Sequence, residues 1–406
     1  MAWERISLGE IAPAGASRMS ATGDSLWHLT LDQLESHTGE IIEKKYIEAD
    51  SIPPSTNRFD DGNVLYSKLR PYLNKVHAPE EAGVATSELV PLRPDPNRLN
   101  RSFLAYFLRS QEFLGFATAC VAGAKMPRMV MRRMWEYQIP VPHPKEQARI
   151  VELLDQADEL RKLRTQADNK AARILPALFH HYFGDISNGH SEIIGDLTSL
   201  VTSGVTPRGG SKVYIDEGPF LIRSQNVQMN AMSLNDVAHI PDEMFKRMER
   251  VQVLPGDTLL NITGASLGRV TPVIRMDQPA VVNQHVCIIR PIPEKLSYVY
   301  LSFLLSTDFY QRAILQQQSG AAQAGFNHSK VRALKIPVPE MSKQHAFAHD
   351  FIQHQETIGM AANSKQKLED LFQLLLHRAF TGELTAKWRE DHMSEIVDEM
   401  TIQTKA

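Results

Sequence analysis

The chain has very little cysteine and no long apolar run. Its 406 residues include two cysteines, Cys120 and Cys287, which lie far apart and in no spacing typical of metal ligands. A disulfide framework or a zinc cluster is therefore not expected, and a cytoplasmic location suits the sequence. No run of about 18 apolar residues is present, so we expect no membrane-spanning helix and no membrane partner. The opening residues, MAWERISLGE, also lack the regions of a signal peptide.

An excess of positive charge is missing as well. The formal net charge is −3, so any binding to nucleic acid would have to come from local basic patches. Hydrophobic residues make up 43% and charged residues 22% of the chain, which is ordinary for a globular protein. A length of 406 residues suits two or three domains.

The sequence does contain a long internal repeat. QIPVPHPKEQ (residues 138–147) and KIPVPEMSKQ (residues 335–344) share I-P-V-P and a glutamine that follows the second proline by five residues. Three further pairs align at offsets of 197 or 194 residues: FLAYFLRS (103–110) with YLSFLLST (300–307), LFHHYFGD (178–185) with LLHRAFTG (375–382), and GNVLYSKLRPYLNKV (62–76) with GDTLLNITGASLGRV (256–270). A period this long indicates a duplicated domain. Duplication for stability alone would explain it, but the divergent middles favour two modules of different specificity.

The sequence pattern of each copy predicts a globular module followed by a long helix. Short β-forming segments bounded by turn residues alternate with apolar helical runs, which indicates a mixed α/β module. We expect the two prolines of I-P-V-P to end the last strand of each module and to direct the chain into the helix. Helix-like apolar spacing then covers residues 145–183 and 342–380. Pro176 is expected to kink the first helix, and Gly359 to weaken the second.

These patterns together predict an α+β fold. Two mixed α/β globular domains in tandem repeat are separated by two long helices, which we expect to form an antiparallel coiled coil; packing on partner helices alone is the alternative. The predicted segments are residues 1–143 (first module), 144–184 (first helix), 185–340 (second module), 341–381 (second helix) and 382–406 (a C-terminal tail that is loose or a short helix).

Several stretches, duplicated in the same order, carry a resemblance to a known family. They are IPVPHPKEQARIVELLDQADEL with its second copy, the helix ends ALFHHYFGD and LLLHRAFTGELTAKW, and the module stretches GNVLYSKLRPYLNKV, TSELVPLRP, FLIRSQNV and GDTLLNITGASLGRV. With these stretches the chain resembles, over essentially its whole length, the DNA specificity subunit of type I restriction–modification enzymes. One departure is Lys343, which stands where the first copy has Glu146, and it puts in doubt how alike the two partner contacts are.

The resemblance implies a non-catalytic reader of double-stranded DNA. Each of two target-recognition domains would read one half of a split, non-palindromic site. The paired helices would act as a spacer and dock two methyltransferase subunits, and a motor nuclease subunit would join the complex. The resemblance implies no cofactor in this chain, because S-adenosylmethionine, ATP and Mg²⁺ would belong to the partner subunits.

Candidate DNA contacts are cations, which suit phosphates, together with amide, arginine and hydroxyl groups, which suit bases. In the first copy they are Lys68, Arg70, Asn74 and Lys75 in a loop after a strand, and Lys125, Arg128, Arg132 and Arg133 in the strongest basic patch. In the second copy they are Arg223, Gln225 and Asn226, then Thr263, Ser266 and Arg269 in the equivalent loop, and Lys330 in a thinner basic stretch. Gly264 and Gly268 would allow a phosphate to approach the backbone. Solvated loops, hydrogen-bonded turns and solvated basic faces are the alternatives.

The sequence gives little support for a catalytic function. Asp32, Glu43 and Lys45 faintly resemble a nuclease metal site, but the second copy has no counterpart, and His345 and His349 lack a third ligand. The sequence has no D/N-P-P-Y/F motif of an adenine methyltransferase and no phosphate-binding P-loop. Two other functions remain open: a specificity subunit for methylation without a nuclease, and a coiled-coil scaffold that joins two protein-binding modules.

Overall fold

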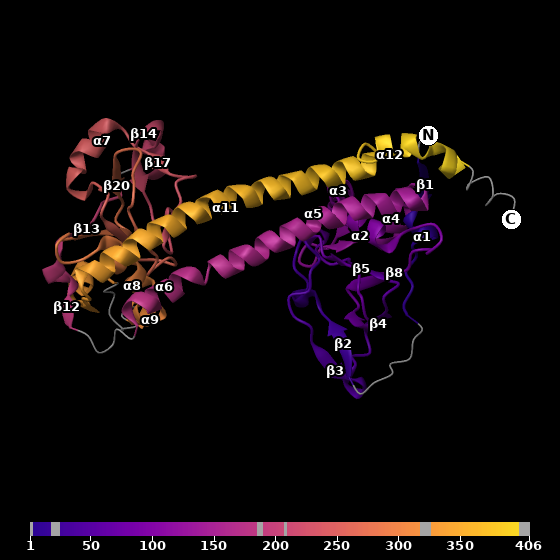
Figure 1. The fold of residues 1–406 in the computed structure, drawn as a ribbon, viewed down its shortest axis with the longest axis horizontal. Helices are drawn as coiled ribbons and strands as arrows, with labels where there is room; N and C mark the ends of the chain where they lie inside the picture. The colour runs from indigo at the N-terminus through magenta and orange to yellow at the C-terminus, as the bar shows by residue number, and fades with distance from the viewer. Residues whose placement is uncertain (1–2, 18–24, 185–189, 207–208, 317–325, 398–406) are drawn as a thin grey trace. The chain divides into compact units, whose positions relative to one another are not determined.

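The computed structural model describes residues 3–17, 25–184, 190–206, 209–316 and 326–397 (Figure 1). The chain divides into two compact units, and each is described by itself. Unit 1 comprises Met1–Gln166 with Asn363–Ala406, and unit 2 comprises Ala167–Ala362. Each unit therefore contains one module, the beginning of one long helical segment and the end of the other. No helix among the described residues is long and apolar enough to cross a membrane.

The module of unit 1 is built on two small sheets with helices beside them. One sheet has the order β3-β2-β7-β4 and the other the order β6-β5-β8. The strands are β1 (Glu4–Ser7), β2 (Ser25–Leu29), β3 (Tyr46–Glu48), β4 (Thr56–Phe59), β5 (Val64–Ser67), β6 (Val76–His77), β7 (Gly83–Thr86), β8 (Leu89–Leu92), β9 (Val121–Ala122), β10 (Arg128–Met129) and β11 (Gln138–Val141). The helices are α1 (Leu8–Ile11), α2 (Arg101–Arg109), α3 (Gln111–Ala119) and α4 (Met131–Glu136).

The module of unit 2 repeats this plan with a different middle. Its sheets have the orders β13-β21-β18-β19, β17-β14-β20 and β15-β16. The strands are β12 (Ser191–Ile193), β13 (Thr198–Ser203), β14 (Ile215–Ile222), β15 (Val227–Gln228), β16 (Ala231–Met232), β17 (Ala238–His239), β18 (Thr258–Asn261), β19 (Val270–Pro272), β20 (Ala280–Val282), β21 (Val286–Pro291) and β22 (Lys335–Pro337). The helices are α7 (Asp242–Arg247), α8 (Tyr298–Ser306), α9 (Asp308–Gln316) and α10 (His328–Ala333). The prediction of mixed α/β modules with two long helices is thus confirmed.

The I-P-V-P stretch ends each module and also pairs with the first strand of that module. In unit 1, β11 pairs antiparallel with β1, and Pro140 lies opposite Arg5. In unit 2, β22 pairs antiparallel with β12, and Pro337 lies opposite Ser191. The expectation that both prolines stop the strand is corrected, because the first proline lies within it. A two-stranded sheet tolerates this proline, since each strand has a free edge that needs no N–H donor. The first and last strands of each module are therefore neighbours.

The first long helix is interrupted, in contrast to the single kinked helix that we expected. It consists of α5 (Pro144–Ala171) and α6 (Ile174–Phe183), whereas α11 (Met341–Thr381) is continuous and passes through Gly359. Pro176 lacks an N–H to bond the carbonyl of Ala172, and its ring would clash with that carbonyl. The break places Pro176 in the first turn of α6, where no intrahelical N–H bond is needed.

In unit 1 the module packs on both long helices through α2. The ring of Phe380, at the end of α11, lies 5.3 Å from the ring of Phe103 and 5.2 Å from that of Phe107. Farther along, Arg161 Nε of α5 donates a hydrogen bond to Glu369 Oε2 of α11 over 2.9 Å. The start of α5 contacts the residues that follow α11, so the two helices run antiparallel within this unit.

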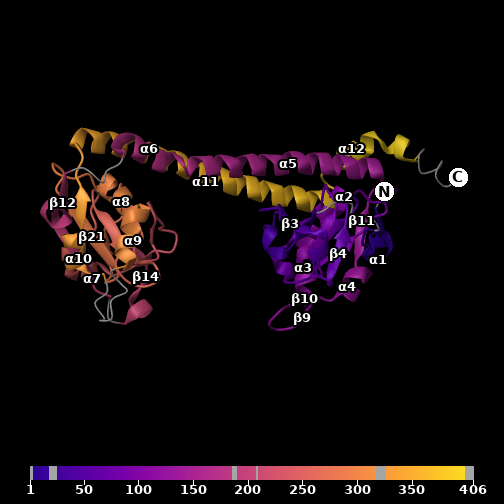
Figure 2. The same cartoon turned by 90° about the horizontal axis from the view of Figure 1, so that it is seen from below.

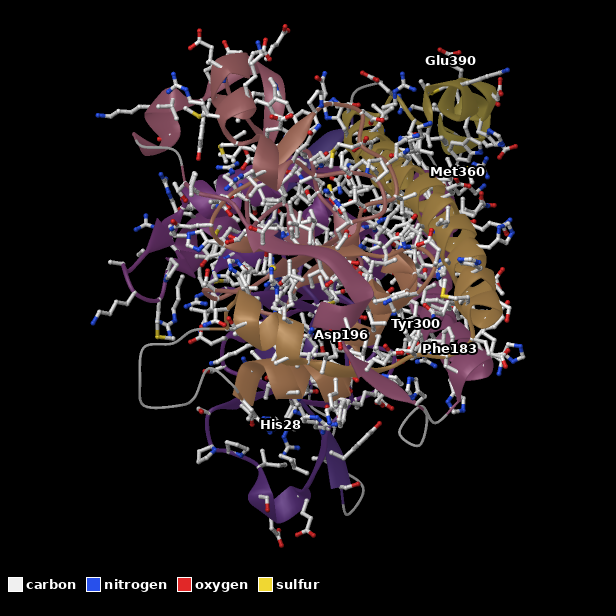
Figure 3. All side chains as sticks on the ribbon, turned by 90° about the vertical axis from the view of Figure 1, so that its left-hand side faces the viewer. His28, Phe183, Asp196, Tyr300, Met360 and Glu390 are labelled. Carbon is white, nitrogen blue, oxygen red and sulfur yellow. The ribbon has the colours of Figure 1, made fainter. Side chains whose placement is uncertain are left out.

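In unit 2 the same arrangement is built from α8. The ring of Phe183, at the end of α6, lies 4.8 Å from that of Tyr300 and 5.5 Å from that of Phe347, and Figure 3 labels Phe183 beside Tyr300. Here His354 Nε2 of α11 lies 3.1 Å from the carbonyl oxygen of Ala171 at the end of α5. The helical segments again run antiparallel, and Phe183 and Tyr300 occupy the positions of Phe380 and Phe103 in the repeat.

The glutamine that follows I-P-V-P in both copies attaches the long helix to the module. Gln147 is completely buried. Its Oε1 accepts from the backbone N–H of Asn100 over 2.7 Å, and its Nε2 donates to the carbonyls of Arg98 and Pro142. Asn100 is the N-cap residue of α2. One side chain therefore joins the starts of α5 and α2.

Gln344 makes the equivalent attachment in unit 2. It is also completely buried. Its Oε1 accepts from the backbone N–H of Ser297, the N-cap residue of α8, over 2.9 Å, and its Nε2 donates to the carbonyl of Pro339 over 2.7 Å. The repeated spacing between the prolines and the glutamine is explained by this pair of contacts. We call Gln147 and Gln344 the glutamine clamps.

The residues after α11 form an ordered segment on unit 1. Glu146, which is 2% exposed, accepts hydrogen bonds from Trp3 Nε1, Thr385 Oγ1 and Arg389 Nε over 3.1, 2.7 and 2.8 Å. Arg389 lies on α12 (Ala386–Asp391). The predicted C-terminal tail therefore includes a short helix; residues 398–406 lie outside the described residues. Lys343, the counterpart of Glu146, is exposed in unit 2.

Candidate nucleic-acid interface

Two basic stretches that are far apart in the sequence form one surface on unit 1. The loop after β5 and the β9–β10 hairpin are joined by backbone hydrogen bonds, from Arg70 N to Pro127 O over 2.7 Å and from Met129 N to Lys68 O over 2.8 Å. A bridge between Leu69 and Arg128 lies between these bonds. In the view of Figure 2, β9, β10 and α4 lie on the side of unit 1 opposite α5. We call this loop, hairpin and helix the basic surface.

The cations of the basic surface differ in how they are neutralised. Arg128 makes a two-pronged pair with Glu88, with Nη2 2.7 Å from Oε1 and Nε 3.0 Å from the same oxygen. The hydrogen bonds from Arg128 hold the pKa of Glu88 below its usual value, against the opposing effect of burial. Arg132 pairs with Glu136 on α4. Three further cations, Arg70, Lys125 and Arg133, are exposed and form no ion pair within the described part of the chain.

The backbone presents Arg70 in an uncommon conformation. Its φ is 50°, in the left-handed region that residues other than glycine seldom adopt. The hydrogen bond from its N–H to Pro127 holds this conformation, and Pro71 starts the following turn. The loop therefore directs an exposed guanidinium out of a rigid backbone.

The structure corrects the role of two predicted contacts in the same loop. Asn74 is 5% exposed, and its Nδ2 donates to the carbonyl of Arg109 over 3.0 Å. Lys75 Nζ donates to the carbonyl of Leu31 over 2.6 Å. Burial lowers the pKa of Lys75, and the nearby Asp32 opposes this effect. Both side chains tie parts of the module together. Asn74 is buried and not available at the surface, whereas Lys75 is partly exposed and its DNA contact stays a prediction.

In unit 2 the two predicted loops are also neighbours. Asn261 Nδ2, at the end of β18, donates to the carbonyl of Ser224 over 2.8 Å, and Asn261 N donates to the carbonyl of Arg269 over 2.8 Å. The loop at residues 223–226 therefore lies beside the loop at residues 263–269. Arg269 and Ser266 are partly exposed, and Thr263 Oγ1 lies 2.6 Å from His285 Nδ1.

The first of these loops is held by its own polar side chains. Asn226 is 2% exposed, and its Oδ1 accepts from the N–H of Arg223, so it is a buried turn residue and not a surface group. Gln225 is exposed, and its Nε2 donates to Asp236 Oδ2 over 2.6 Å. Arg223 Nη2 donates to the carbonyl of Asp236 over 2.7 Å. Gln225 and Arg223 thus reach the surface beside a carboxylate, while Asn226 does not.

Only one of the two glycines expected to admit a phosphate has room for it. Gly264 (φ 77°) is exposed, and nothing lies near the position of a side chain. Gly268 (φ 88°) is buried against the side chain of Gln311, whose Nε2 donates to its carbonyl over 2.8 Å. Gly268 therefore serves packing inside the module, which corrects the expectation. Lys330 lies on α10, at the position of Arg133 in the repeat. Residues 317–325, which correspond to much of the β9–β10 hairpin, are outside the described residues.

A family model described as the type I restriction modification DNA specificity domain matches residues 31–172 and 230–370. The chain belongs to this family. The two matched ranges cover more than half of the chain, and each contains the divergent middle of a module and the beginning of a long helix. The resemblance seen in the sequence is thus confirmed, and the specificity domain is present in two copies.

Relatives and solved structures agree with this assignment. The chain is 27% identical over 151 residues to the type I restriction enzyme EcoDI specificity subunit of Escherichia coli, with 36% of this chain and 33% of that protein covered. It is 21% identical over 323 residues to the MjaVIII specificity subunit of Methanocaldococcus jannaschii, with 75% of each covered. The match to the first relative thus spans about a third of its length. The type I restriction–modification S subunit from M. genitalium has the same fold, with a TM-score of 0.60, 13% identity, and 93% and 96% of the two chains covered.

Sequence reasoning missed two residues that organise the specificity domains. Glu88 anchors Arg128, and Asn261 holds the two loops of unit 2 together. Glu88 lies inside the stretch TSELVPLRP, which carried the family resemblance, so its acidic character next to a basic patch was a usable signal. Asn261 lies in the stretch GDTLLNITGASLGRV, which also carried the resemblance, but no feature of the sequence indicated its contact with Ser224.

Asp32, Glu43 and Lys45, which faintly resemble a metal site in the sequence, form exposed ion pairs. Lys45 Nζ lies 3.8 Å from both Asp32 Oδ2 and Glu43 Oε2, and all three side chains are more than half exposed. Among the described residues, no group of three or more His, Cys, Asp or Glu side chains could hold a metal ion. This part of the specificity domain is therefore interpreted as a solvated charged surface.

Proposed function

We propose that the chain is the DNA-recognition subunit of a type I restriction–modification complex, and that each module reads one half of a split, non-palindromic site. The observation that carries this proposal is the loop after β5 and its counterpart after β18. The two loops start from equivalent strands of equivalent modules, yet one carries Lys68 and Arg70 and the other Thr263 and Ser266. Equal scaffolds with different polar loops are expected of two readers that bind different sequences.

The first test concerns the phosphate contacts of the basic surface. The chain is assembled with its methyltransferase partner, and DNA affinity is measured over a range of salt concentrations. Alanine at Arg70, Lys125 or Arg133 should weaken binding and reduce the salt slope by about one each if the side chain contacts a phosphate. Lys387→Ala, at an exposed position of α12, is the matched control and should change neither quantity. A salt-independent affinity would instead favour a scaffold that joins protein-binding modules.

The second test concerns the split site. Methylated adenines are mapped across the genome with the chain and its methyltransferase. Replacement of residues 1–138 by the module of another specificity subunit should change one half-site and leave the other unchanged. A palindromic site, or methylation that does not depend on this chain, would contradict the proposal. Cleavage in the presence of neighbouring nuclease genes would separate a restriction complex from one that only methylates.

We further propose that the long helices pair as an antiparallel coiled coil that spaces the half-sites and docks two methyltransferase subunits. Supporting this, each unit carries an exposed apolar pair on its helices at repeat-equivalent positions. Leu163 of α5 and Leu371 of α11 are 50% and 48% exposed in unit 1, and Met360 of α11 and Ile174 of α6 are 69% and 47% exposed in unit 2. Figure 3 labels Met360 on α11. Contiguous exposed apolar patches mark partner contacts, and we propose that each pair forms part of one.

The docking proposal is tested by stoichiometry. Glutamine at both Leu163 and Leu371 should remove one methyltransferase copy from the complex, and glutamine at both Met360 and Ile174 should remove one as well. The mass of the assembled complex measures this directly. Gln156→Ala, at an exposed polar position of α5, is the control and should leave the mass unchanged. Loss of both copies from either double variant would contradict separate docking sites.

We propose that the chain itself performs no chemistry, and that S-adenosylmethionine, ATP and Mg²⁺ are bound by its partners. Incubation of the purified chain with DNA, S-adenosylmethionine and Mg²⁺ should yield neither methylated nor cleaved DNA. Either product would contradict this part of the proposal.

A further inference from the structure

Unit 1 contains a groove of about 490 Å³ between its module and the long helix α5. Arg101 and Arg109 of α2 line one side, Asp158 and Lys162 of α5 the other, and Trp27 of β2 lies in the module wall. The groove is separate from the basic surface, and the proposed function does not use it.

Arg109 has unused hydrogen-bonding capacity in this groove. Its side chain is 10% exposed, and neither Nε nor Nη2 has a hydrogen-bond partner. Nη2 lies 3.7 Å from Asp158 Oδ1, but this carboxylate also pairs with Arg161 over 2.7 Å and with Lys162 over 3.5 Å. Nε and Nη2 form the edge of a guanidinium that binds two oxygens of one carboxylate or phosphate group. The unused edge of Arg109 therefore offers the two parallel donors from which an oxyanion accepts, and both nitrogens are closed to solvent in this structure.

Other groups in the groove also favour a ligand that accepts hydrogen bonds. Trp27 Nε1 is buried and has no partner, and an indole N–H can only donate. Arg101 donates to the carbonyls of Asp61 and Pro79, and it forms no ion pair within the described ranges of the chain. Its positive charge is thus matched by neutral groups alone.

The carboxylates that line the groove are already engaged or exposed. Asp155 accepts from Tyr106 Oη over 2.7 Å, Glu40 pairs with Lys162 over 3.2 Å, and Glu80 is exposed. Buried donors without a partner are costly, so an incoming acceptor is favoured over a further cation.

The second copy shows that these charges are not needed to join a module to its helix. Unit 2 has a groove of about 420 Å³ at the equivalent place. There the positions of Arg109, Asp158 and Lys162 are occupied by Ser306, Gln355 and Gly359. Gln355 Nε2 donates to the carbonyl of Asn230 over 3.1 Å, and Asn230 Nδ2 donates to Ser306 Oγ over 2.9 Å. Hydrogen bonds between neutral groups thus make the same junction in unit 2, although Asn230 Oδ1 has no partner there. The junction alone therefore does not explain the charged set in unit 1.

We propose that the groove of unit 1 binds an oxyanion, either a carboxylate or a phosphate group, on the Nε–Nη2 edge of Arg109. The ligand supplies the acceptors that Arg109 lacks, and the charge of Arg101 adds to the attraction. The groove of unit 2 does not bind it, since it has no arginine at that position.

The test uses the full chain with inorganic phosphate and with acetate at constant ionic strength. All four tryptophans, Trp3, Trp27, Trp135 and Trp388, belong to unit 1, so the thermal unfolding of this unit is followed by tryptophan fluorescence. We expect a saturable rise of the unfolding temperature, as for any ligand that binds only the folded state. Arg109→Lys keeps the charge but removes the two-pronged edge, and it should raise the dissociation constant by about tenfold or more.

Two further variants separate binding from folding. Arg109→Ser with Asp158→Gln installs the neutral pair of the second groove and should abolish the saturable rise, while Lys387→Gln at an exposed position of α12 should leave it unchanged. Repeating the titration on the complex with the methyltransferase identifies the source of the oxyanion: loss of the phosphate effect indicates a partner carboxylate, and its persistence indicates a free anion. The proposal is overturned if neither anion gives a saturable effect, or if Arg109→Lys and the double variant respond as the parent chain does.

Discussion

Unit 1 and unit 2 share a frame and differ in the charges built on it. Both close their module with the strands on either side of I-P-V-P, both use a glutamine clamp, and both seat aromatic rings of the long helices on the first helix after the sheets. One ion pair is shared, between Arg93 and Asp60 in unit 1 and between Arg290 and Asp257 in unit 2. The ionic contacts at Glu146, Asp158 and Arg109 belong to unit 1, and the equivalent positions of unit 2 carry Lys343, Gln355 and Ser306. The frame therefore depends on backbone pairing, buried amides, apolar packing and this shared ion pair, and the other charges differ between the copies.

The largest effect is expected from making the start of α5 resemble the start of α11. Glu146→Lys installs the residue of the second copy and places a cation against Arg389 in a buried site. Breaking a buried pair in this way costs about 3–5 kcal/mol, so unit 1 should unfold at much lower urea concentration by tryptophan fluorescence.

The reverse exchange is the control for this change. Lys343→Glu alters an exposed position, and such substitutions usually change stability by less than about 0.5 kcal/mol. Equal losses from the two exchanges would show that the ionic anchor at Glu146 is not specific to unit 1.

A second comparison concerns proline in the long helices. Gln373 of α11 stands at the repeat position of Pro176, and α11 is continuous there. Gln373→Pro should break α11 and cost about 3 kcal/mol or more. Pro176→Gln restores an N–H for the carbonyl of Ala172 and should increase the helical signal in circular dichroism, with a gain of about 1 kcal/mol. A loss of helical signal in the Pro176 variant would show that the break has another cause.

The two glutamine clamps should contribute similar but unequal amounts to the free energy of unfolding. Gln147→Ala leaves the N–H of Asn100 and two carbonyls without their partner, which costs about 2–3 kcal/mol in urea unfolding of unit 1. Gln344→Ala removes one hydrogen bond fewer, and we expect a loss smaller by about 1 kcal/mol, measured by circular dichroism. Gln156→Ala, at an exposed position of α5, serves as the control. If a clamp variant is as stable as this control, that glutamine does not contribute to the stability of its unit.

The smallest effect is a difference in acid sensitivity. Burial lowers the pKa of His77 below its usual value, and the second copy has the buried Thr271 at this position. The folded state thus binds fewer protons than the unfolded state, so stability is lost as the pH falls below about 6.5 toward the lowered pKa. His77→Thr should reduce the loss between about pH 8 and pH 5.5 by up to about 1 kcal/mol, measured by urea unfolding at both pH values. If the stability of the His77→Thr variant depends on pH as that of the parent chain does, other groups cause the acid sensitivity.

Local sequence patterns predicted the frame because its signals are short and repeated. The I-P-V-P stretches mark the ends of both modules, and the helical spacing after them locates α5 and α11. The pairing of β1 with β11 was not predictable in this way, because it joins residues more than 130 positions apart. The exact break before Pro176 was missed for a different reason: a proline restricts the residues before it, and whether the helix kinks or restarts depends on packing.

The candidate site was predicted less well than the frame. Residue type alone made Asn74, Asn226 and Gly268 look like surface contacts, but all three are buried and serve the interior of their modules. Burial depends on which segments meet in space, and the sequence of a loop does not reveal this. The contact between the Lys68–Arg70 loop and the β9–β10 hairpin is not predictable for the same reason, although the sequence shows that each segment is basic.

The division of the chain has a consequence for how the protein folds during synthesis. Unit 2 is one continuous stretch, whereas unit 1 needs residues from both ends of the chain. Phe380 can reach Phe103 and Phe107 only after all of unit 2 has been made. At about 5–20 residues per second, the delay between residue 166 and residue 363 is about 10–40 s. During this interval the nascent first module exposes the apolar face that α11 will cover, and such a face is open to aggregation or chaperone binding.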